Sequence, residues 1–210
     1  MNSPDFEIAD ASAVIDYLAT LDTVTQDGPS DPRVGFAGGS YGGALSLMAA
    51  GYDNRVNAVS ADITWNDLQT SLFGQSVSNP PASRGVGVFK QLWGGLFFSA
   101  GLVTQDGQVT DCGRFAPDWC AAYSTAAADG VLTDKARELM AASSPASITD
   151  RISVPTLLGG GQSDSLFPLA QTSANAEQIS AANETVKVVW HAGGHDGGVD
   201  ESDRLRDLNA

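Results

Sequence analysis

The sequence carries little positive charge: 11 Lys and Arg residues stand against 25 Asp and Glu, and the formal net charge at pH 7 is −14. A surface this acidic repels the phosphates of nucleic acids and the headgroups of anionic lipids. We therefore expect neither a nucleic-acid partner nor a membrane-surface partner.

Cysteine and histidine are scarce, with two of each among 210 residues. Cys112 and Cys120 cannot build a disulfide framework, and with only His191 and His195 beside them they are too few for a structural zinc site. Two alternatives for the cysteines stay open, a single local disulfide or two reduced, buried thiols. We expect no metal ion and no cofactor.

Long apolar runs are absent as well. The longest uncharged apolar stretch, around residues 92–102, is too short to span a bilayer and is interrupted by Gly94 and Gly95. Residues 1–6 contain neither the basic run nor the apolar run of a signal peptide. The expected location is cytoplasmic by default, with secretion left open for a longer parent protein.

Hydrophobic residues make up 42% of the chain and charged residues 17%, which is enough to bury a sizeable core. An apolar run over residues 33–38 predicts a buried strand, residues 44–51 predict a helix, and residues 56–61 predict a second strand. Strand, tight turn, helix and strand make a parallel βαβ unit. Before it, residues 5–21 predict an amphipathic helix whose apolar face holds Ile8, Val14, Ile15, Leu18 and Leu21.

The α/β pattern is interrupted in the middle of the chain and then resumes. We interpret residues 63–149 as an inserted helical cap, flanked by residues 1–62 and 150–210 of one α/β core. The elements expected after the insertion are a strand at 154–159, a helix over 169–183, a strand at 186–190 and the start of a helix at 201–208.

The segment Gly38-Gly39-Ser40-Tyr41-Gly42 lies between the first predicted strand and the helix after it. A nucleophile at the top of a sheet needs a very tight strand-to-helix turn, and small residues two positions before and after it relieve the backbone crowding. The helix also directs its N–H groups toward the place where an oxyanion forms. We predict Ser40 as a nucleophile and the Tyr41 backbone N–H as an oxyanion donor. The plainer alternative is a glycine-rich turn with a solvated serine.

A serine hydroxyl becomes a good nucleophile when a base accepts its proton, and an acid must orient that base. His195 lies in a glycine-rich loop directly after the strand at 186–190, and we predict it as the base. His191 ends the strand and is expected to be packed there. Asp196, next to the predicted base, is expected to lie in a solvated turn.

Asp164 is the predicted acid. It follows the strand at 154–159 through a glycine-rich turn, where a carboxylate can meet a histidine from the loop of the next strand. Asp62, directly after the second predicted strand, is the rival for this role.

Three segments, residues 38–43, 161–168 and 193–198, resemble the X-prolyl dipeptidyl peptidase and cocaine esterase superfamily of serine hydrolases. The resemblance covers nearly the whole chain, and the order Ser40, Asp164, His195 is that of α/β-hydrolases. It implies a partial α/β-hydrolase core, the C-terminal half of the parallel sheet, with an inserted cap. It also implies acyl-enzyme cleavage of a small-molecule ester or a short peptide, without a metal or cofactor.

The sequence departs from this family in two ways. Members carry several strands before the nucleophile strand, together with a tyrosine hydroxyl that serves as second oxyanion donor, and no residue here matches that tyrosine. Many relatives also end in a jelly-roll domain, which we expect to be absent here. We therefore expect a fragment of a longer hydrolase, with weak activity and with self-association through the exposed edge of the nucleophile strand.

The sequence also bears on other functions. Dinucleotide binding is disfavoured, because no G-x-G-x-x-G follows a predicted strand and no Gly-Lys pair offers a phosphate-binding loop. A non-catalytic fragment or binding module that keeps the fold is the remaining alternative. Trp65 and Trp93 are the predicted pocket residues, with ordinary core packing as the competing interpretation. The full aromatic set that raises this question is Trp65, Phe89, Trp93, Phe97, Phe98 and Trp119.

Overall fold

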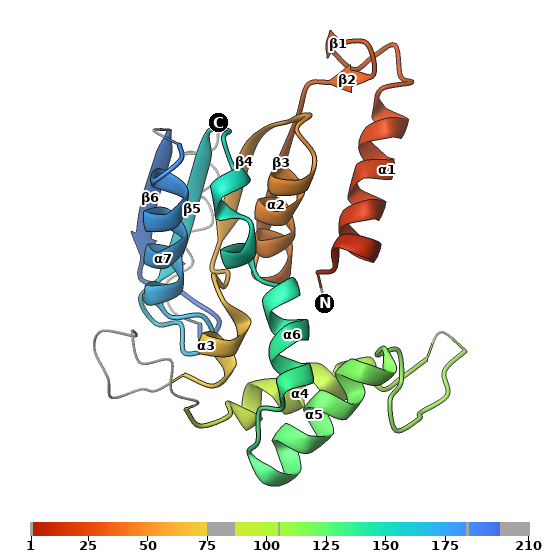
Figure 1. Cartoon of the computed structure of the whole chain (residues 1–210), viewed down its shortest axis with the longest axis vertical. Coiled ribbons are helices and arrows are strands. Elements are labelled where there is room, and N and C mark those ends of the chain that lie inside the picture. The colour runs from red at the N-terminus through yellow and green to blue at the C-terminus, as the bar shows by residue number, and fades with distance from the viewer. Residues whose placement is uncertain (1, 75–86, 105, 184, 198–210) are drawn as a thin grey trace. The chain divides into compact units, whose positions relative to one another are not determined.

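The chain divides into two compact units (Figure 1). We call residues 1–67 and 142–210 the sheet unit and residues 68–141 the insertion unit. The insertion unit lies within the residues 63–149 predicted as a cap, and residues 63–67 and 142–149 belong to the sheet unit. The structure, a computed structural model, describes residues 2–74, 87–104, 106–183 and 185–197.

Four parallel strands form the sheet of the described part of the sheet unit, in the order β3-β4-β5-β6 (Figure 1). Since they are parallel, all four end at the same edge, and the loops that follow them meet there. The strands are β3 (Val34–Gly39), β4 (Val56–Asp62), β5 (Thr156–Gly161) and β6 (Val186–His191).

Helices α2 and α7 pack on this sheet, α2 against β3 and β4 and α7 against β5 and β6. Within the described ranges, no helix is both long and apolar enough to cross a membrane. Besides the four strands of the sheet, the described elements of this unit are a π-helical turn η1 (Pro4–Ile8), α1 (Ala9–Leu18), the short antiparallel pair β1 (Gln26–Gly28) and β2 (Asp31–Pro32), α2 (Tyr41–Tyr52), the 3₁₀ turns η2 (Pro145–Ser147) and η3 (Thr149–Arg151), and α7 (Leu169–Ser180).

The four strands of the sheet and helices α1, α2 and α7 lie where the sequence predicts them, with ends shifted by a few residues. The β1–β2 pair and the 3₁₀ turns were not predicted. Val14 is a correction to the predicted apolar face of the first helix, since it is 55% exposed while Ile15 is 1% exposed. Successive helical residues are about 100° apart, and the buried stripe follows Ile8 and Ile15. The helix predicted at 201–208 lies outside the described residues.

One face of the sheet carries the hydrophobic core. Side chains alternate between the two faces of a strand, so β4 buries Val59 and Ala61 against the helices. The buried core residues are Ile8, Ile15, Leu47, Met48, Ala50, Val56, Val59, Ala61, Ile148, Ile152, Leu158 and Ile179.

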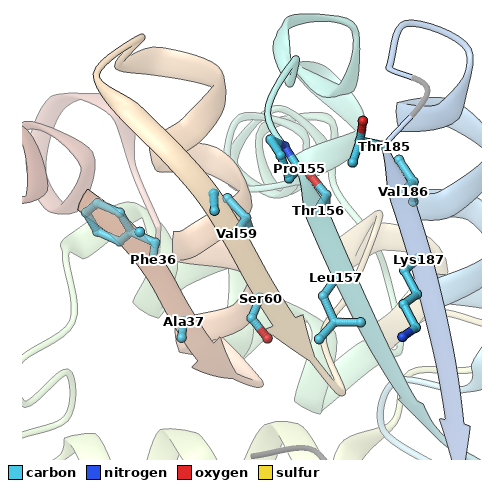
Figure 2. A pocket seen from close by; sticks show the side chains of 12 residues that line it. Phe36, Ala37, Val59, Ser60, Pro155, Thr156, Leu157, Thr185, Val186 and Lys187 are labelled. Carbon is cyan, nitrogen blue, oxygen red and sulfur yellow. The ribbon is translucent and has the colours of Figure 1, made fainter. Parts of the chain in front are cut away.

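A groove of about 630 Å³ runs across the middle of β3 and β4 and the amino ends of β5 and β6. Figure 2 shows its lining, which includes Ala37 of β3, Ser60 of β4, Leu157 of β5 and Lys187 of β6. The groove therefore lies away from the edge where the loops after the strands meet.

The insertion unit is helical and has its own aromatic cluster. Phe98 stacks between Phe115 and Tyr123, with ring centroids 4.7 and 3.9 Å apart, and Phe89 stacks on Phe73 at 5.0 Å. Phe89 and Phe98 thus serve as packing residues within this unit. Its helices are α3 (Leu68–Leu72), α4 (Gln91–Gly101), α5 (Pro117–Asp129) and α6 (Asp134–Ala142), of which the last reaches the border of the unit.

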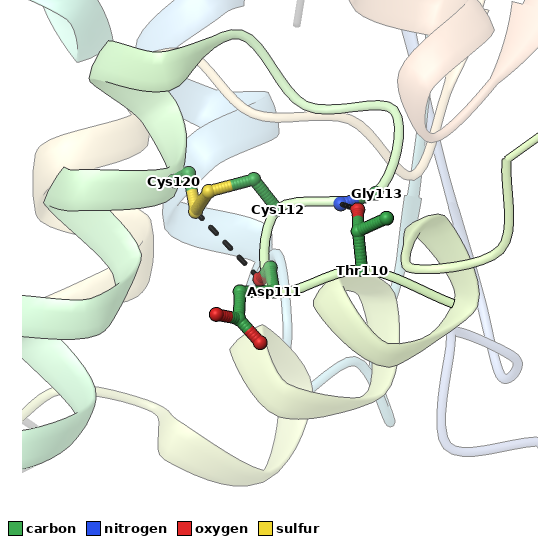
Figure 3. Close-up of a disulfide and its surroundings, with 5 residues drawn as sticks. All are labelled: Thr110, Asp111, Cys112, Gly113 and Cys120. Carbon is green, nitrogen blue, oxygen red and sulfur yellow. Dashed lines mark hydrogen bonds between the residues drawn. A yellow bond between two sulfur atoms is a disulfide. The ribbon is translucent and has the colours of Figure 1, made fainter. Parts of the chain in front are cut away.

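Cys112 and Cys120 form a disulfide, with their Cα atoms 5.5 Å apart (Figure 3). Cys112 lies in a loop, and Cys120 belongs to α5. Thr110 Oγ1 accepts a hydrogen bond from the Gly113 N–H at 2.8 Å, which closes the turn around Cys112. The disulfide thus ties this turn to the first half of α5.

We predict that purified protein titrates no free thiol in denaturant without reductant and two thiols after reduction. Opening a loop whose ends lie 8 residues apart should lower the free energy of unfolding by roughly 2–3 kcal/mol in the chain-entropy account. Urea unfolding of the double variant Cys112→Ser/Cys120→Ser measures this loss. Two thiols titrated before reduction would contradict the pairing.

Arg55 links α1 to the turn between α2 and β4. It donates to both carboxylate oxygens of buried Asp53, at 2.9 and 2.7 Å, and to Asp16 at 2.6 Å. The hydrogen bonds from Arg55 lower the pKa of the Asp53 carboxyl below its ordinary value. The resulting stabilisation is complete above the ordinary carboxyl pKa of about 4 and is lost as the pH falls through the lower pKa of the folded state.

Asp53→Asn should therefore lower the free energy of unfolding at pH 7 by about 2 kcal/mol, which is roughly 4–8 °C in Tm. Thermal unfolding between pH 2.5 and 7 should show this difference shrinking in acid. Exposed Asp22→Asn is the matched control. A loss of Tm at pH 3 as large as at pH 7 would contradict the account.

Candidate active site

Ser40 lies at the turn between β3 and α2 with a strained backbone, φ 54° and ψ −119°. Non-glycine residues seldom adopt positive φ, and such strain persists only where surrounding contacts hold it. Here the Ser40 N–H donates to the carbonyl of Asp62 at 2.9 Å, and Thr64 Oγ1 donates to the Ser40 carbonyl at 2.7 Å. The end of β4 thus holds the Ser40 backbone from both sides.

The glycines around Ser40 differ in how closely they are packed. A Cβ at Gly38 would lie 2.5 Å from the Gly42 carbonyl carbon, and a Cβ at Gly43 would lie 2.9 Å from the Thr64 Cβ. At Gly42 an added Cβ would meet nothing within 4 Å. The crowding predicted for both flanking positions of the motif therefore applies to Gly38 and to Gly43, and the prediction for Gly42 is wrong.

Ser40, His195 and Asp164 form a continuous hydrogen-bonded line. Ser40 Oγ is 2.7 Å from His195 Nε2, and His195 Nδ1 is 2.7 Å from Asp164 Oδ2. A carboxylate only accepts hydrogen bonds, so Nδ1 carries the proton of the neutral ring and Nε2 is left to accept the Ser40 hydroxyl proton. The structure thus brings together the three residues that the sequence singles out.

The environment of Asp164 holds its carboxylate in place. Its side chain is fully buried, Oδ1 accepts the Phe167 N–H at 2.7 Å, and Oδ2 also accepts the His195 N–H at 3.3 Å. The Phe167 ring stands edge-on to the His195 ring, with centroids 5.2 Å apart. Sequence reasoning did not assign Phe167 a role, because contact between the two loops is a tertiary feature.

Asp62, the rival for the role of the acid, pairs with the histidine that ends β6. His191 Nε2 is 3.1 Å from Asp62 Oδ1, and the His191 residue is 8% exposed. His191 is thus packed at the end of β6, as expected. Sequence reasoning gave neither residue a partner.

Asp196 does more than occupy a solvated turn. Its carboxylate accepts the backbone N–H of Ser165 at 2.5 Å and the Ser165 hydroxyl at 2.7 Å. Both hydrogen bonds lower the pKa of the Asp196 carboxyl, and the one from the Ser165 backbone has the larger effect. Asp196 thereby connects the histidine loop to the acid loop at the surface.

Tyr41 is the first residue of α2, so its backbone N–H has no acceptor within the helix. Its hydroxyl donates to Glu7 Oε1 at 3.0 Å, and burial together with the Glu7 charge raises the pKa of the phenol. The hydroxyl therefore stays protonated and holds the ring against η1. The backbone N–H lies next to Ser40, where the sequence predicts the oxyanion donor.

Trp65 is a correction to the predicted pocket. It is 1% exposed, its indole N–H donates to the Ser143 carbonyl at 2.9 Å, and its ring contacts Phe167 and Tyr41 at centroid distances of 5.0 and 6.2 Å. Trp65 thus supports the neighbours of Ser40 and His195 from inside the core. Trp93 belongs to the insertion unit, where it stacks on Phe97, and its pocket role stays a prediction.

Metal ligands do not gather in the described part of the chain. No three His, Cys, Asp or Glu side chains there come close enough together to hold a metal ion. Independently of this, the hydrogen bond between Ser40 Oγ and His195 Nε2 is a route by which a proton can pass from the serine to the histidine.

Solved structures share this fold. An esterase from Pyrococcus furiosus matches with a TM-score of 0.56 at 15% identity, over 99% of this chain and 61% of that chain. A 2,6-dihydroxy-pseudo-oxynicotine hydrolase matches with a TM-score of 0.55 at 20% identity, over 99% of this chain and 45% of that chain. A puromycin-hydrolyzing peptidase from Mycobacterium tuberculosis matches with a TM-score of 0.53 at 20% identity, over 97% of this chain and 24% of that chain.

The fold is thus that of the α/β-hydrolases, and the chain spans about 61% or less of the length of these three relatives. The sequence pattern of the X-Pro dipeptidyl-peptidase family, S15, matches residues 3–197. The chain belongs to this family. No curated protein sequence matches it. The family and the fold predicted from the three motifs are confirmed.

The two motif glycines give a matched test of the turn. Gly38→Ala should lower the free energy of unfolding by about 1–3 kcal/mol or more, because its Cβ meets backbone that cannot move aside. Gly42→Ala should be neutral or stabilising, by up to roughly 1 kcal/mol, since Gly42 lies in the first turn of α2. Urea unfolding measures the free energy of unfolding of both variants. Equal losses in Gly38→Ala and Gly42→Ala would contradict this account of the turn.

Proposed function

We propose that this chain is a serine hydrolase that cleaves an ester or an amide bond through an acyl-enzyme. The observation that carries the proposal is the Ser40–His195–Asp164 line, with both side-chain separations at 2.7 Å. The positive φ of Ser40 supports it, because a nucleophile elbow presents its hydroxyl in this way.

In the proposed reaction, Ser40 Oγ attacks the substrate carbonyl carbon while its proton passes to His195 Nε2. The imidazolium that forms is stabilised by the buried Asp164 carboxylate. His195 then donates the proton to the leaving alcohol or amine, which departs and leaves the acyl group on Ser40. Water attacks the acyl-enzyme with His195 again as base, which releases the acid and restores the serine.

The developing oxyanion needs preorganised donors, and the Tyr41 N–H is the donor that we propose from this chain. In the family that this sequence resembles, a tyrosine hydroxyl is the second oxyanion donor, and no residue here matches that tyrosine. Loss of one oxyanion donor typically costs about 10²–10³ in turnover. We therefore propose slow turnover for the 210-residue chain by itself.

Small esters and short peptides are the proposed substrates. One solved relative is an esterase and another a peptidase that hydrolyses puromycin, so both bond types occur on this fold. The alternative, a non-catalytic module that keeps the fold, predicts the same architecture without reactivity at Ser40. Reaction with an active-site-directed probe separates the two.

The probe experiment uses a fluorophosphonate, with Ser40→Ala as control and p-nitrophenyl acetate turnover measured beside it. We expect labelling that depends on Ser40, together with slow turnover. If a folded chain is not labelled, the non-catalytic alternative holds for it.

Asp164→Asn tests the role of the acid. The amide no longer selects the tautomer in which His195 Nε2 accepts a proton, so the rate of p-nitrophenyl acetate turnover should fall by about 10⁴ or to background. Asp22→Asn makes the same chemical change at an exposed site and should leave the rate unchanged. Turnover of Asp164→Asn within tenfold of the parent chain would exclude Asp164 as the orienting acid.

We also propose that the chain self-associates through β3. Among the described residues β3 pairs only with β4, and Gly35 and Ala37 on it are exposed. Unpaired strand edges recruit further strands, and a lysine on the edge discourages this. Ala37→Lys should shift the molar mass seen by light scattering toward the monomer. Ala121→Lys adds the same charge at an exposed position of α5, which is not a strand, and an equal shift there would contradict the proposal.

The location of the protein stays a prediction. A disulfide such as Cys112–Cys120 persists in oxidising compartments and is rare in the cytosol. We therefore propose an oxidising compartment over the cytoplasmic default.

A further inference from the structure

A second histidine–aspartate pair lies beside the proposed catalytic residues and takes no part in the proposed reaction. His191 Nε2 and Asp62 Oδ1 are 3.1 Å apart, with the His191 side chain 8% and the Asp62 side chain 28% exposed. Burying a polar side chain is favourable only when it is hydrogen-bonded, and here each residue satisfies the other. The hydrogen bond between them therefore accounts for the burial of these polar side chains. Their position beside the proposed catalytic residues points to a further role.

The pair reaches across a strand. Asp62 ends β4, His191 ends β6, and β5 runs between them, with Gly159 opposite Asp62 and Gly161 opposite His191. A Cβ at Gly159 would lie 2.0 Å from Asp62 Oδ1, so only glycine leaves room for the contact. The glycine run of β5 thus lets two strands that are not neighbours join directly.

At one end, Asp62 is hydrogen-bonded to the backbone of the nucleophile, Ser40. The Asp62 carbonyl accepts the Ser40 N–H at 2.9 Å, while the Asp62 carboxylate faces His191. The same residue therefore holds the backbone of Ser40 and the side chain of His191.

At the other end, His191 begins the histidine loop, and this start of the loop is hydrogen-bonded to the acid loop. The His191 carbonyl accepts the Gln162 N–H at 2.8 Å, and the next two carbonyls accept the Ser163 hydroxyl at 3.0 Å and the Ser163 N–H at 3.1 Å. The loop from His191 to His195 is thus fixed against the acid loop. The contact with Asp62 connects this assembly to Ser40 without using the Ser40–His195 hydrogen bond.

We propose that His191 and Asp62 are positioning residues that keep His195 aligned with Ser40 while Ser40 carries the acyl group. In the acyl-enzyme the Ser40 oxygen has no proton to share, so the 2.7 Å hydrogen bond to His195 Nε2 is lost. The His191–Asp62 contact survives this step, because neither side chain takes part in it. It holds the base in place to activate the water that releases the acid.

This inference rests on the proposed function, and its test is the deacylation rate. The chain is acetylated with p-nitrophenyl acetate, the excess reagent is removed, and loss of the acetyl mass is followed over time. Asp62→Ala and His191→Ala should slow deacylation by about 10–100-fold, since displacement of a catalytic group by about 1 Å has effects of this size. The double variant should be no slower than the slower single variant, because the two side chains act as one unit.

Asp62→Asn keeps an oxygen that accepts from His191 and should retain deacylation within about threefold of the parent chain. Thr156→Ala, a buried polar change at the amino end of β5, controls for simple destabilisation. All rates are measured below the unfolding midpoint of each variant, so that loss of fold is not counted as loss of rate.

Three results would overturn the inference. Deacylation of both alanine variants within threefold of the parent chain leaves the pair with a structural role only. A loss in Asp62→Asn equal to that in Asp62→Ala excludes hydrogen-bonded positioning. Absence of any acetyl or fluorophosphonate adduct on the parent chain removes the proposed function and the inference together, whereas an adduct with unaffected variants removes the inference alone.

Discussion

Parallel pairing of β3, β4, β5 and β6 is the constraint on which the site depends. The register places Gly39 beside Asp62, Asp62 beside Gly159, and Gly161 beside His191, so the strands end at one edge. Ser40 and His195, which are 155 residues apart in the sequence, therefore come within 2.7 Å. A slip of one residue in any of these strands would turn its side chains to the other face and separate the three loops.

Backbone strain gathers at this edge. Ser40 and Ile63 both have positive φ, at 54° and 39°, and a β-branched residue such as Ile63 is seldom found there. Asp62 and Thr64 bind the Ser40 backbone, and the Ile63 N–H donates to the Gly159 carbonyl at 3.1 Å. The strain of the turn is thus held by the end of the neighbouring strand, which also carries one half of the His191–Asp62 pair.

Local patterns predicted the strands, the turn at Ser40 and the order of the three loops, because each depends on residues close together in the sequence. Contacts between distant residues outside the Ser40–His195–Asp164 line were not predictable. Asp62 was recognised only as the rival of Asp164, without its partner His191, and Trp65 was assigned to a pocket although it lies in the core. Both depend on tertiary packing, which residue periodicity does not encode.

The central claim is that Ser40 forms the covalent bond to the acyl group. Peptide mapping by mass spectrometry after reaction with a fluorophosphonate tests it most directly, because it identifies the modified residue. The account predicts one adduct, on the peptide that contains Ser40, and its loss in His195→Ala. An adduct on another serine, or an undiminished Ser40 adduct in His195→Ala, would contradict it.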